Sequence, residues 1–431
     1  MLHDNLSVGE NGHLYLCGAD TVTLAEKYGT PLYLLDEDRI REKCRTYHRA
    51  MKAYFTPDSR PLYASKALSF RGIYRIAREE GMAVDVVSPG ELYTALSAGM
   101  DAADICFHGN AKTEADIRYA IDAGVGLFAA DSTVELDRIS AYAVQRGITQ
   151  RVLLRITPGI DPHTFDAVNT GKVDSKFGSA IVTGQAEEIF CYARALPGVE
   201  LCGFHCHIGS QIFDEKPFCD AADMMLTFMI ALRDTYGYTA EILNLGGGIG
   251  VRYTEEDPYI DIDRTLELVG AHLHAVCEET HYPMPKILME PGRSLVADAG
   301  VTVYEVQNVK TIDGYKSYAA IDGGMTDNPR YALYRSRYTV VNASRASAPA
   351  DFVCTVAGRC CESGDLIGED IALARPACGE YLAVLVTGAY NYAMSSNYNC
   401  IAKPPIVLIA GGVDRLAVRR ETFEEMTACQ L

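Results

Sequence analysis

Apolar runs alternate with amphipathic stretches along most of the chain from residue 60 onward. Buried strands are predicted at 60–67, 83–88, 104–109, 127–132, 151–158, 199–209, 242–248 and 286–292. Helices are predicted between them, among others at 70–80, 113–123, 133–146, 217–236 and 262–279. Repeated strand–helix units favour a parallel sheet with right-handed crossovers. Eight units in a stretch near the typical length of about 250 residues fit an α/β fold of the (β/α)8 TIM-like barrel type. A doubly wound open sheet is the alternative.

The pattern changes near residue 295. Short β-type runs, separated by glycine and polar clusters, follow at 301–306, 317–321, 338–341, 351–356, 381–385 and 405–409. They predict a second, mostly antiparallel β-domain. Two further strands, near residue 14 and at 31–35, precede a helix over 36–54. The strand near residue 14 has no place in a barrel, so we expect it to join the second domain. The predicted division is a barrel over 36–294 and a β-sandwich or barrel-like domain over 1–35 and 295–431.

Composition narrows the classes of function. The net charge of −18 over 431 residues argues against a nucleic-acid partner or an anionic membrane partner. No apolar run is long enough to cross a bilayer, and the first ten residues lack a signal-peptide pattern. The fourteen cysteines therefore suggest reduced thiols of a cytoplasmic enzyme. Without paired Cys-x-x-Cys spacings, a structural zinc site is not expected.

Lys66 ends the first predicted barrel strand, Arg60-Pro61-Leu62-Tyr63-Ala64-Ser65-Lys66. A lysine at such a strand end would be desolvated, which favours the neutral amine. A neutral amine is a nucleophile that can form a Schiff base with an aldehyde cofactor. The alternative is a strand-end lysine that reaches out to water.

Other reactive side chains also fall at the predicted carboxyl ends of strands, where barrels build their sites. Asp85 lies on the second strand, and His205 and His207 end the sixth. These two histidines share a face and could hold a metal. With no third ligand at zinc-site spacing, an imidazole laid against a planar cofactor ring is the functional interpretation, and a core histidine is the alternative.

Three glycines, Gly246–Gly248, follow the seventh strand, and Glu290 and Arg293 follow the eighth. The glycines can bring backbone N–H groups to a phosphate, although a plain tight turn would use them too. Glu290 is placed to hold a proton on a pyridine nitrogen, and a plain ion pair with Arg293 is the alternative. A lysine for an aldehyde, glycines for a phosphate and an acid for a ring nitrogen together indicate a pyridoxal 5'-phosphate site.

The whole chain resembles the diaminopimelate decarboxylases, which belong to a barrel-fold group of pyridoxal phosphate enzymes that also holds ornithine and arginine decarboxylases. The motifs that carry the resemblance are YASKA at 63–67, HCHIGSQ at 205–211, LGGG at 245–248, EPGR at 290–293, CESGD at 361–365 and GAYNYAMSSNYN at 388–399. Asn169-Thr170-Gly171 and Asp174-Ser175-Lys176-Phe177-Gly178 resemble a loop typical of the diaminopimelate branch. Leu68 and Cys360 depart from the usual family pattern.

This resemblance implies roles for individual residues. Lys66 would be the Schiff-base lysine and Cys361 the proton donor. The cofactor-binding residues would be Lys66, Asp85, His207, Ser210, Gly247, Gly248, Glu290, Gly292, Arg293 and Tyr390. The substrate-binding residues would be Arg293, Arg330, Tyr334, Glu362 and Tyr390. The resemblance also implies a homodimer whose active sites are shared across the interface, with the CESGD stretch reaching the partner's barrel.

The expected reaction is the pyridoxal phosphate-dependent decarboxylation of meso-2,6-diaminopimelate to L-lysine and carbon dioxide, the last step of lysine biosynthesis. Its substrate carries a distal amino-carboxylate, for which Arg330 offers a planar fork and Glu362 an acid. Alternatively, Arg330 braces a dimer interface or the turn at Asp327.

Three rival functions remain. The nearest is decarboxylation of ornithine, arginine or carboxynorspermidine. An alanine-racemase-like isomerase is the second, but that group favours arginine where Glu290 stands. A regulator that keeps the fold without the cofactor is the third, and Lys66, Glu290 and Cys361 argue against it.

Overall fold

The computed structural model describes residues 1–160 and 175–431. It divides into two compact units. The barrel unit comprises Lys43–Gly250 and Tyr259–Ser294, and the β unit comprises Met1–Glu42, Val251–Pro258 and Leu295–Leu431. Of the loop that resembles the diaminopimelate branch, residues 169–171 and 174 lie outside the described residues.

Eight parallel strands close into a barrel, because the first strand pairs with the last and each of the others with the next along the chain. They are β5 (Arg60–Ala64), β6 (Ala83–Val86), β7 (Ile105–Phe107), β8 (Leu127–Ala130), β9 (Gln150–Thr157), β11 (Val199–His205), β12 (Ile242–Asn244) and β13 (Lys286–Met289). A short strand, β10 (Ser179–Ala180), pairs with β9 outside this ring. The predicted (β/α)8 barrel is confirmed, and the open sheet is excluded.

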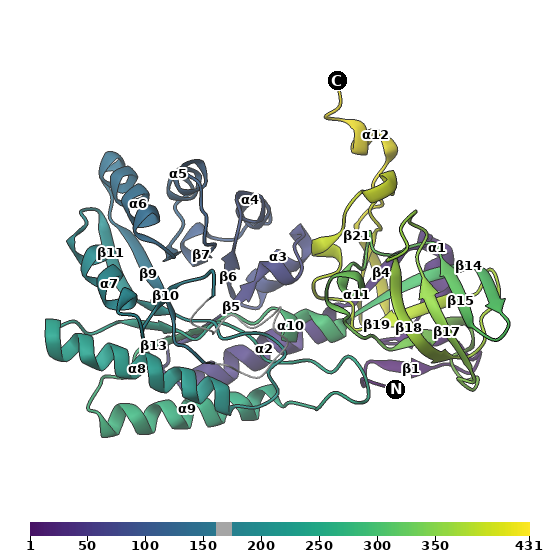
Figure 1. Ribbon diagram of the computed structural model, residues 1–431, viewed down its shortest axis with the longest axis horizontal. Helices are drawn as coiled ribbons and strands as arrows, with labels where there is room; N and C mark the ends of the chain where they lie inside the picture. Colours follow the sequence, from purple (N-terminus) through teal and green to yellow (C-terminus); the bar gives the residue numbers. More distant parts are fainter. Residues whose placement is uncertain (161–174) are drawn as a thin grey trace. The chain divides into compact units, whose positions relative to one another are not determined.

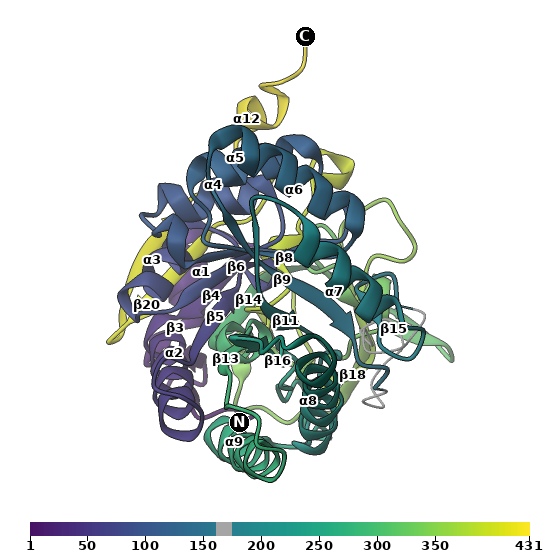
Figure 2. The same ribbon diagram turned by 90° about the vertical axis from the view of Figure 1, so that its left-hand side faces the viewer.

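Helices surround the barrel strands (Figures 1 and 2). They are α2 (Glu37–Tyr54), α3 (Arg71–Glu79), α4 (Pro89–Ser97), α5 (Glu114–Ala123), α6 (Thr133–Arg146), α7 (Gln185–Ala195), α8 (Lys216–Tyr236), α9 (Ile262–Glu279) and α10 (Arg293–Val296). Local sequence sets their ends. Ser88 caps α4, with proline at the next position, and Ser132 caps α6, which stops at Gly147 in the left-handed conformation.

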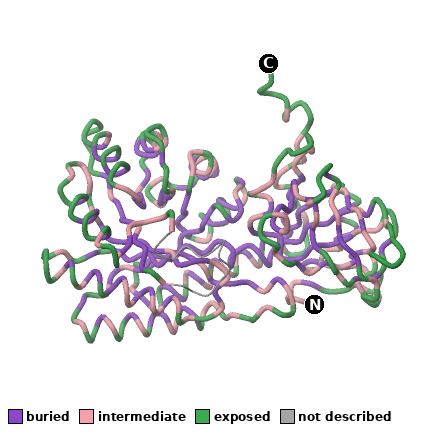
Figure 3. The backbone as a smooth tube through the Cα atoms, viewed as in Figure 1, coloured by how far each residue is buried: buried purple, intermediate pink, exposed green. Residues whose placement is uncertain are grey.

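The barrel strands are largely buried (Figure 3). Buried apolar side chains from the strands form one hydrophobic cluster: Leu62, Ala83, Cys106, Leu127, Ala129, Leu153, Cys202, Ile242 and Leu288. Titratable side chains gather instead at the carboxyl ends of the strands, where barrels build their sites.

The β unit holds a mixed, mostly antiparallel sheet, as predicted. Its strands run in the order β18-β17-β15-β14-β4-β20-β21, and β19 pairs with both β14 and β16. The bounds are β4 (Leu32–Asp36), β14 (Gly300–Ile312), β15 (Lys316–Ile321), β16 (Val340–Asn342), β17 (Phe352–Ala357), β18 (Leu366–Leu373), β19 (Tyr381–Leu385), β20 (Ile406–Ala410) and β21 (Val413–Val418). Two short helices, α11 (Arg330–Tyr334) and α12 (Phe423–Thr427), belong to this unit. The fully buried β4 lies centrally, between β14 and β20.

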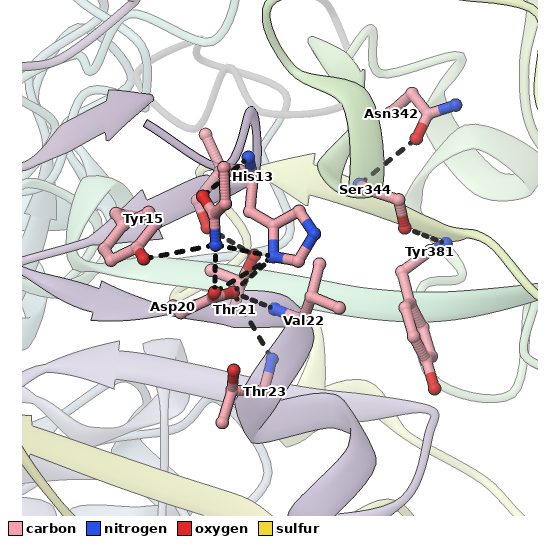
Figure 4. Close-up of polar contacts among 11 residues, drawn as sticks. His13, Tyr15, Asp20, Thr21, Val22, Thr23, Asn342, Ser344 and Tyr381 are labelled. Atoms are coloured by element: carbon pink, nitrogen blue, oxygen red, sulfur yellow. Dashed lines mark hydrogen bonds and ion pairs between the residues drawn. The ribbon is translucent and has the colours of Figure 1, made fainter. Parts of the chain in front are cut away.

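The strand near residue 14 joins the β unit, as expected, but not its large sheet. It forms a three-stranded sheet from β1 (Leu6–Val8), β2 (Leu14–Leu16) and β3 (Ala19–Asp20), followed by α1 (Thr21–Tyr28). Asp20 caps α1 by accepting hydrogen bonds from the N–H groups of Val22 and Thr23 (Figure 4). The same carboxylate accepts a hydrogen bond from Asn11 Nδ2, and its Oδ2 lies 2.9 Å from His13 Nδ1. These contacts connect the turn between β1 and β2 to the start of the helix.

No helix among the described residues is long and apolar enough to cross a membrane.

A buried ion pair holds the loop after β7. Lys112 Nζ donates to Glu135 Oε1 at 2.6 Å and to the carbonyl oxygens of Gly109 and Ala129 at 2.8 Å each. The two charged side chains are only 2% and 4% exposed. All three ammonium donors are thus used, as a buried charge requires.

We expect the variant Lys112→Met to destabilise the barrel unit, because it leaves the Glu135 carboxylate buried without its cation. Breaking a buried pair on one side should lower the melting temperature by roughly 5–10 °C. The matched control is Lys216→Met, which removes an exposed pair with Asp220 and should change the melting temperature by less than about 2 °C. Equal shifts in the two variants, measured by circular dichroism, would contradict this account.

Candidate active site

A cavity of about 340 Å³ opens at the carboxyl ends of the barrel strands. Most of the residues that line it carry titratable side chains. The lining residues are Lys66, Asp85, Val87, His108, Gly109, Asn110, Arg155, Phe177, His205, His207 and Glu290. Four residues that the sequence predicted for the site, Lys66, Asp85, His207 and Glu290, therefore lie together.

The carboxylate of Glu290 is held by three side chains from other strand ends. Its Oε1 accepts from Asn244 Nδ2 at 2.7 Å and lies 2.7 Å from His108 Nε2, and its Oε2 lies 3.1 Å from His205 Nε2. These partners end or directly follow β12, β7 and β11. Burial alone would raise the pKa of Glu290, but the facing imidazoles bring it well below its usual value. Glu290 is thus held as an anion, and its predicted alternative partner, Arg293, bonds elsewhere.

The titratable groups near Glu290 differ in their pKa values and so in their charge. Burial lowers the pKa of His205 to about 4, so this imidazole is neutral and donates to Glu290. Burial also lowers the pKa of His108, but Cys106, Glu290 and Asp85 outweigh it and raise the pKa well above its usual value. Burial raises the pKa of Asp85 to about 6, and its Oδ1 has no hydrogen-bond partner in the described part of the chain. An orphaned buried carboxylate oxygen of this kind points to a bound polar group.

Lys66 differs from its predicted setting. The strand β5 ends at Ala64, and a 3₁₀ turn, Ser65–Ala67, carries Lys66 beyond the strand. The lysine is exposed, whereas its neighbours Ser65 and Ala67 are buried. The desolvation predicted from the strand pattern is therefore wrong for this chain, because the turn lifts the side chain out of the core.

His207 lies in the same cavity and is oriented by the glycine loop. The N–H of Gly247 donates to His207 Nδ1 at 3.3 Å. Burial and the nearby Lys66 charge lower the pKa of His207 well below its usual value, so the ring is neutral. A neutral imidazole with one fixed nitrogen can lie flat against an aromatic ring.

The glycines after β12 are required by close backbone contacts. A Cβ on Gly247 would lie 2.2 Å from the carbonyl oxygen of Glu290. A Cβ on Gly248, whose φ is +128°, would lie 2.5 Å from that of Gly209. Nearby, Arg293 Nε donates to Ser210 Oγ at 3.0 Å. An amine, a fixed anion, a neutral ring and a glycine loop beside an arginine together fit pyridoxal phosphate.

Gly292 packs on the turn that carries Lys66. A Cβ there would lie 3.0 Å from that of Ala64 and 3.1 Å from that of Ala67. Its place in the EPGR motif is therefore explained by packing against β5 and the following turn.

The grouping of His108, His205 and Glu290 was not predicted. Sequence reasoning paired His205 with His207, but His205 faces Glu290 together with His108, with the ring centroids of the two histidines 4.8 Å apart. These three residues offer ligand atoms within 4.8 Å of one another and could hold a metal, yet the same atoms already bond to one another. The position of His108, directly after β7, was the signal that could have found it.

The remaining predicted residues lie in the β unit. Arg330 is buried, and its guanidinium carbon lies 5.5 Å from the ring centre of Tyr334 and 5.6 Å from that of Tyr390. Its Nη2 donates to Ser336 Oγ at 3.3 Å, and Nε has no hydrogen-bond partner among the described residues. No carboxylate forms an ion pair with Arg330 in residues 1–160 and 175–431.

Asp327 is held by other groups than Arg330. Its carboxylate accepts from the N–H of Gly324 at 3.0 Å and from Tyr304 OH at 2.5 Å. Bracing of the Asp327 turn is thus performed by Tyr304 and Gly324.

Cys361 and Glu362 are exposed on the loop between β17 and β18. The N–H of Cys361 donates to Asn399 Oδ1 at 2.7 Å, and Glu362 Oε1 accepts from the N–H of Gly364 at 3.2 Å. The adjacent Cys360 is buried, and burial with a contribution from Asp365 raises its pKa to about 12. Of the two neighbouring thiols, Cys361 is therefore the accessible one.

Comparison with known proteins agrees with this chemistry. Residues 37–297 match the family described as "Pyridoxal-dependent decarboxylase, pyridoxal binding domain", so the barrel and its cavity are those of a pyridoxal phosphate-dependent decarboxylase. The chain is 41% identical over 430 residues to the diaminopimelate decarboxylase of Bacillus subtilis, covering 100% of this chain and 98% of that protein. It is 40% identical to the one of Staphylococcus aureus, with 97% of each chain covered.

Solved structures give the same result. A diaminopimelate decarboxylase from M. jannaschii in complex with L-lysine has a TM-score of 0.91 at 32% identity, with 100% of this chain and 99% of that chain covered. A lysine/ornithine decarboxylase from Vibrio vulnificus has a TM-score of 0.74 at 23% identity, with 91% of this chain and 99% of that chain covered, a likeness of fold alone. The chain belongs to the diaminopimelate decarboxylase family.

The cluster around Glu290 makes the pH dependence of activity testable. In His108→Gln a donor to Glu290 remains but the positive charge is lost, so the pKa values of Glu290 and Asp85 should rise. Because activity that needs anionic Glu290 is lost as pH falls through its pKa, the acidic limb of the kcat profile should move up by about 1 pH unit. The control His272→Gln alters only a surface contact with Asp223. An unmoved limb in His108→Gln would show that this histidine does not set the charge of Glu290.

Proposed function

We propose that this chain removes one carboxylate from meso-2,6-diaminopimelate and so produces L-lysine and carbon dioxide, the last step of lysine biosynthesis. The observation that carries the choice of substrate is Arg330, a residue only 7% exposed whose guanidinium has no carboxylate partner among the described residues. A buried cation without an anion is costly, and the distal carboxylate of diaminopimelate is an anion that would pair with it. Ornithine ends in an ammonium group and would leave Arg330 unpaired.

Each residue of the barrel cavity has a proposed task. Lys66 would supply the amine that binds the cofactor's aldehyde, and Glu290 would keep a proton on the pyridine nitrogen. His207 would lie against the ring, and Asp85 would offer its unpaired oxygen to the same pocket. The phosphate would be bound by the N–H groups of the glycine loop and by nearby polar groups, namely Ser210, Gly247, Gly248, Gly292 and Arg293. When bound, pyridoxal phosphate supplies an electron sink for the pair left behind by carbon dioxide.

The β unit would supply the other groups. Cys361 would deliver a proton to the α-carbon after carbon dioxide has left. Arg330 and Tyr334 would bind the distal carboxylate, Glu362 the distal ammonium, and Tyr390 both cofactor and substrate, with Arg293 also touching substrate. In this proposal the barrel domain of 36–294 binds the cofactor, and residues 1–35 and 295–431 complete the site.

We further propose a homodimer that shares its active sites. The exposure of Cys361 and Glu362 supports it, because two groups proposed to act on substrate lie on an open loop of the chain. Exposed Leu333, Tyr334 and Tyr398 in the same unit add apolar area for a second copy to cover. The proposed location is the cytoplasm, which all fourteen cysteines support by being unpaired.

A product assay tests the reaction. Offered meso-diaminopimelate, ornithine and arginine side by side, the protein should release carbon dioxide from the first, with L-lysine as the product. Lys66→Ala should fold, because an exposed lysine leaves no hole in the core, but it should lose turnover and the borohydride-reducible adduct with pyridoxal phosphate. A full adduct in this variant would assign the anchor to another lysine. Equal rates on the three amino acids would overturn the substrate assignment.

Arg330→Ala tests the distal contact. It should raise KM for meso-diaminopimelate by about 10- to 100-fold, the loss expected for a buried charge-assisted pair. The residual activity on ornithine, which lacks the distal carboxylate, should change little. The matched control is Arg337→Ala, which removes an exposed arginine paired with Glu256. Equal losses of kcat/KM on both substrates would mean that Arg330 supports the fold or the dimer instead.

A further inference from the structure

The buried carboxylate of Asp365 holds the backbone of the loop that carries Cys361. Asp365, 2% exposed, accepts the N–H of Cys360 on Oδ2 at 2.7 Å and the N–H of Met325 on Oδ1 at 2.5 Å. A Cβ on Gly358 would lie 2.2 Å from this carboxylate, and one on Gly324 2.3 Å. The backbone is therefore shaped around Asp365 and holds the loop at Cys360.

The next amide, that of Cys361, is held by a different segment. Its N–H donates to Asn399 Oδ1 at 2.7 Å. Asn399 lies 38 positions further along the chain, in the segment between β19 and β20. Two consecutive N–H groups are thus each held by a side-chain oxygen, one from within the loop and one from outside it.

The backbone at Asn399 is in an unfavourable conformation. Asn399 has φ +52° and ψ +23°, and the following Cys400 has φ +56°. Residues other than glycine avoid this left-handed region, and asparagine tolerates it better than most. Such outliers persist where surrounding contacts hold them and are frequent at functional sites. The hydrogen bond to Cys361 is one such contact.

We propose that Asn399 is a positioning residue that aims Cys361 at the substrate. This inference rests on the proposed role of Cys361 as proton donor. A proton reaches the correct carbon only if the thiol is held closely in place, and a loop tip exposed to solvent does not hold itself. Asn399 acts through the backbone of Cys361 and needs no contact with substrate.

The variant Asn399→Gly separates this role from a structural one. Glycine takes the left-handed conformation without strain, and this relief offsets part of the cost of the lost hydrogen bond and of glycine's greater freedom in the unfolded chain, so the melting temperature of the holoenzyme should change by no more than about 3 °C. The hydrogen bond is lost, so the Cys361 amide should exchange with deuterium about 10-fold faster. With meso-diaminopimelate, less than one L-lysine should form per carbon dioxide released. In the remaining turnovers the proton would go to the cofactor carbon that bears the nitrogen instead of the α-carbon, and hydrolysis would then release 2-amino-6-oxohexanoate and leave pyridoxamine phosphate. Activity should also decay during turnover and return on addition of fresh pyridoxal phosphate.

Two matched variants complete the test. Asn399→Asp keeps an acceptor oxygen and should restore most of the equivalence between lysine and carbon dioxide. Asn397→Ala removes a neighbouring asparagine that bonds Ile401 and Glu421, and it should leave the equivalence intact. If Asn399→Gly keeps lysine and carbon dioxide equivalent, or if Asn399→Asp fails to rescue it, Asn399 does not position Cys361.

Cys361→Ala distinguishes failure of this inference from failure of the proposed function. If Cys361→Ala forms less than one L-lysine per carbon dioxide, while Asn399→Gly still forms one, the role of Asn399 alone is overturned. Full equivalence at the normal rate in Cys361→Ala would overturn the role of Cys361 itself, and that of Asn399 with it.

Discussion

The compensation of one buried negative charge organises the barrel's cavity. Glu290 lies among apolar strands, where an unpaired carboxylate would take up a proton. Three donors from three other strand ends, His108, His205 and Asn244, prevent this. Each of them is displaced if its strand shifts by one residue, because side chains alternate between the two faces of a strand. The register of the barrel and the charge of Glu290 therefore depend on each other.

The β unit uses buried acids in a similar way. Asp327 and Asp365 accept backbone N–H groups from the turn at 324–327 and from the loop at 358–365. Burial raises the pKa of Asp327 to about 7, and the hydroxyl of Tyr304 donates to it. These acids shape loops, whereas the buried cation Arg330 has no anion among the described residues. The contrast between satisfied acids and an unsatisfied cation favours an anionic ligand at Arg330.

Much of the fold could be predicted because it follows from local pattern. The helix over 133–146 was predicted to the residue, and the eight barrel strands were predicted to within about four residues at each end. The predictions were wrong where contacts between distant parts of the chain decide the secondary structure. The first barrel strand ends at Ala64 instead of 67, because a 3₁₀ turn follows it. The strand β18 was not predicted, since its partly exposed sequence shows no clear alternation and its pairing with β17 is what makes it a strand.

The sequence by itself determined the class of fold, the kind of cofactor and the strand ends at which the titratable side chains of the barrel cavity lie. Hydrophobic period and strand-end chemistry are local properties that can be read from neighbouring residues. Tertiary structure alone decided which groups face each other. His108 pairs with Glu290, and Arg293 bonds Ser210, because residues up to about 180 positions apart meet only when the sheet closes. It also decided the charges, since the pKa of a side chain depends on burial and on neighbours that no local pattern specifies.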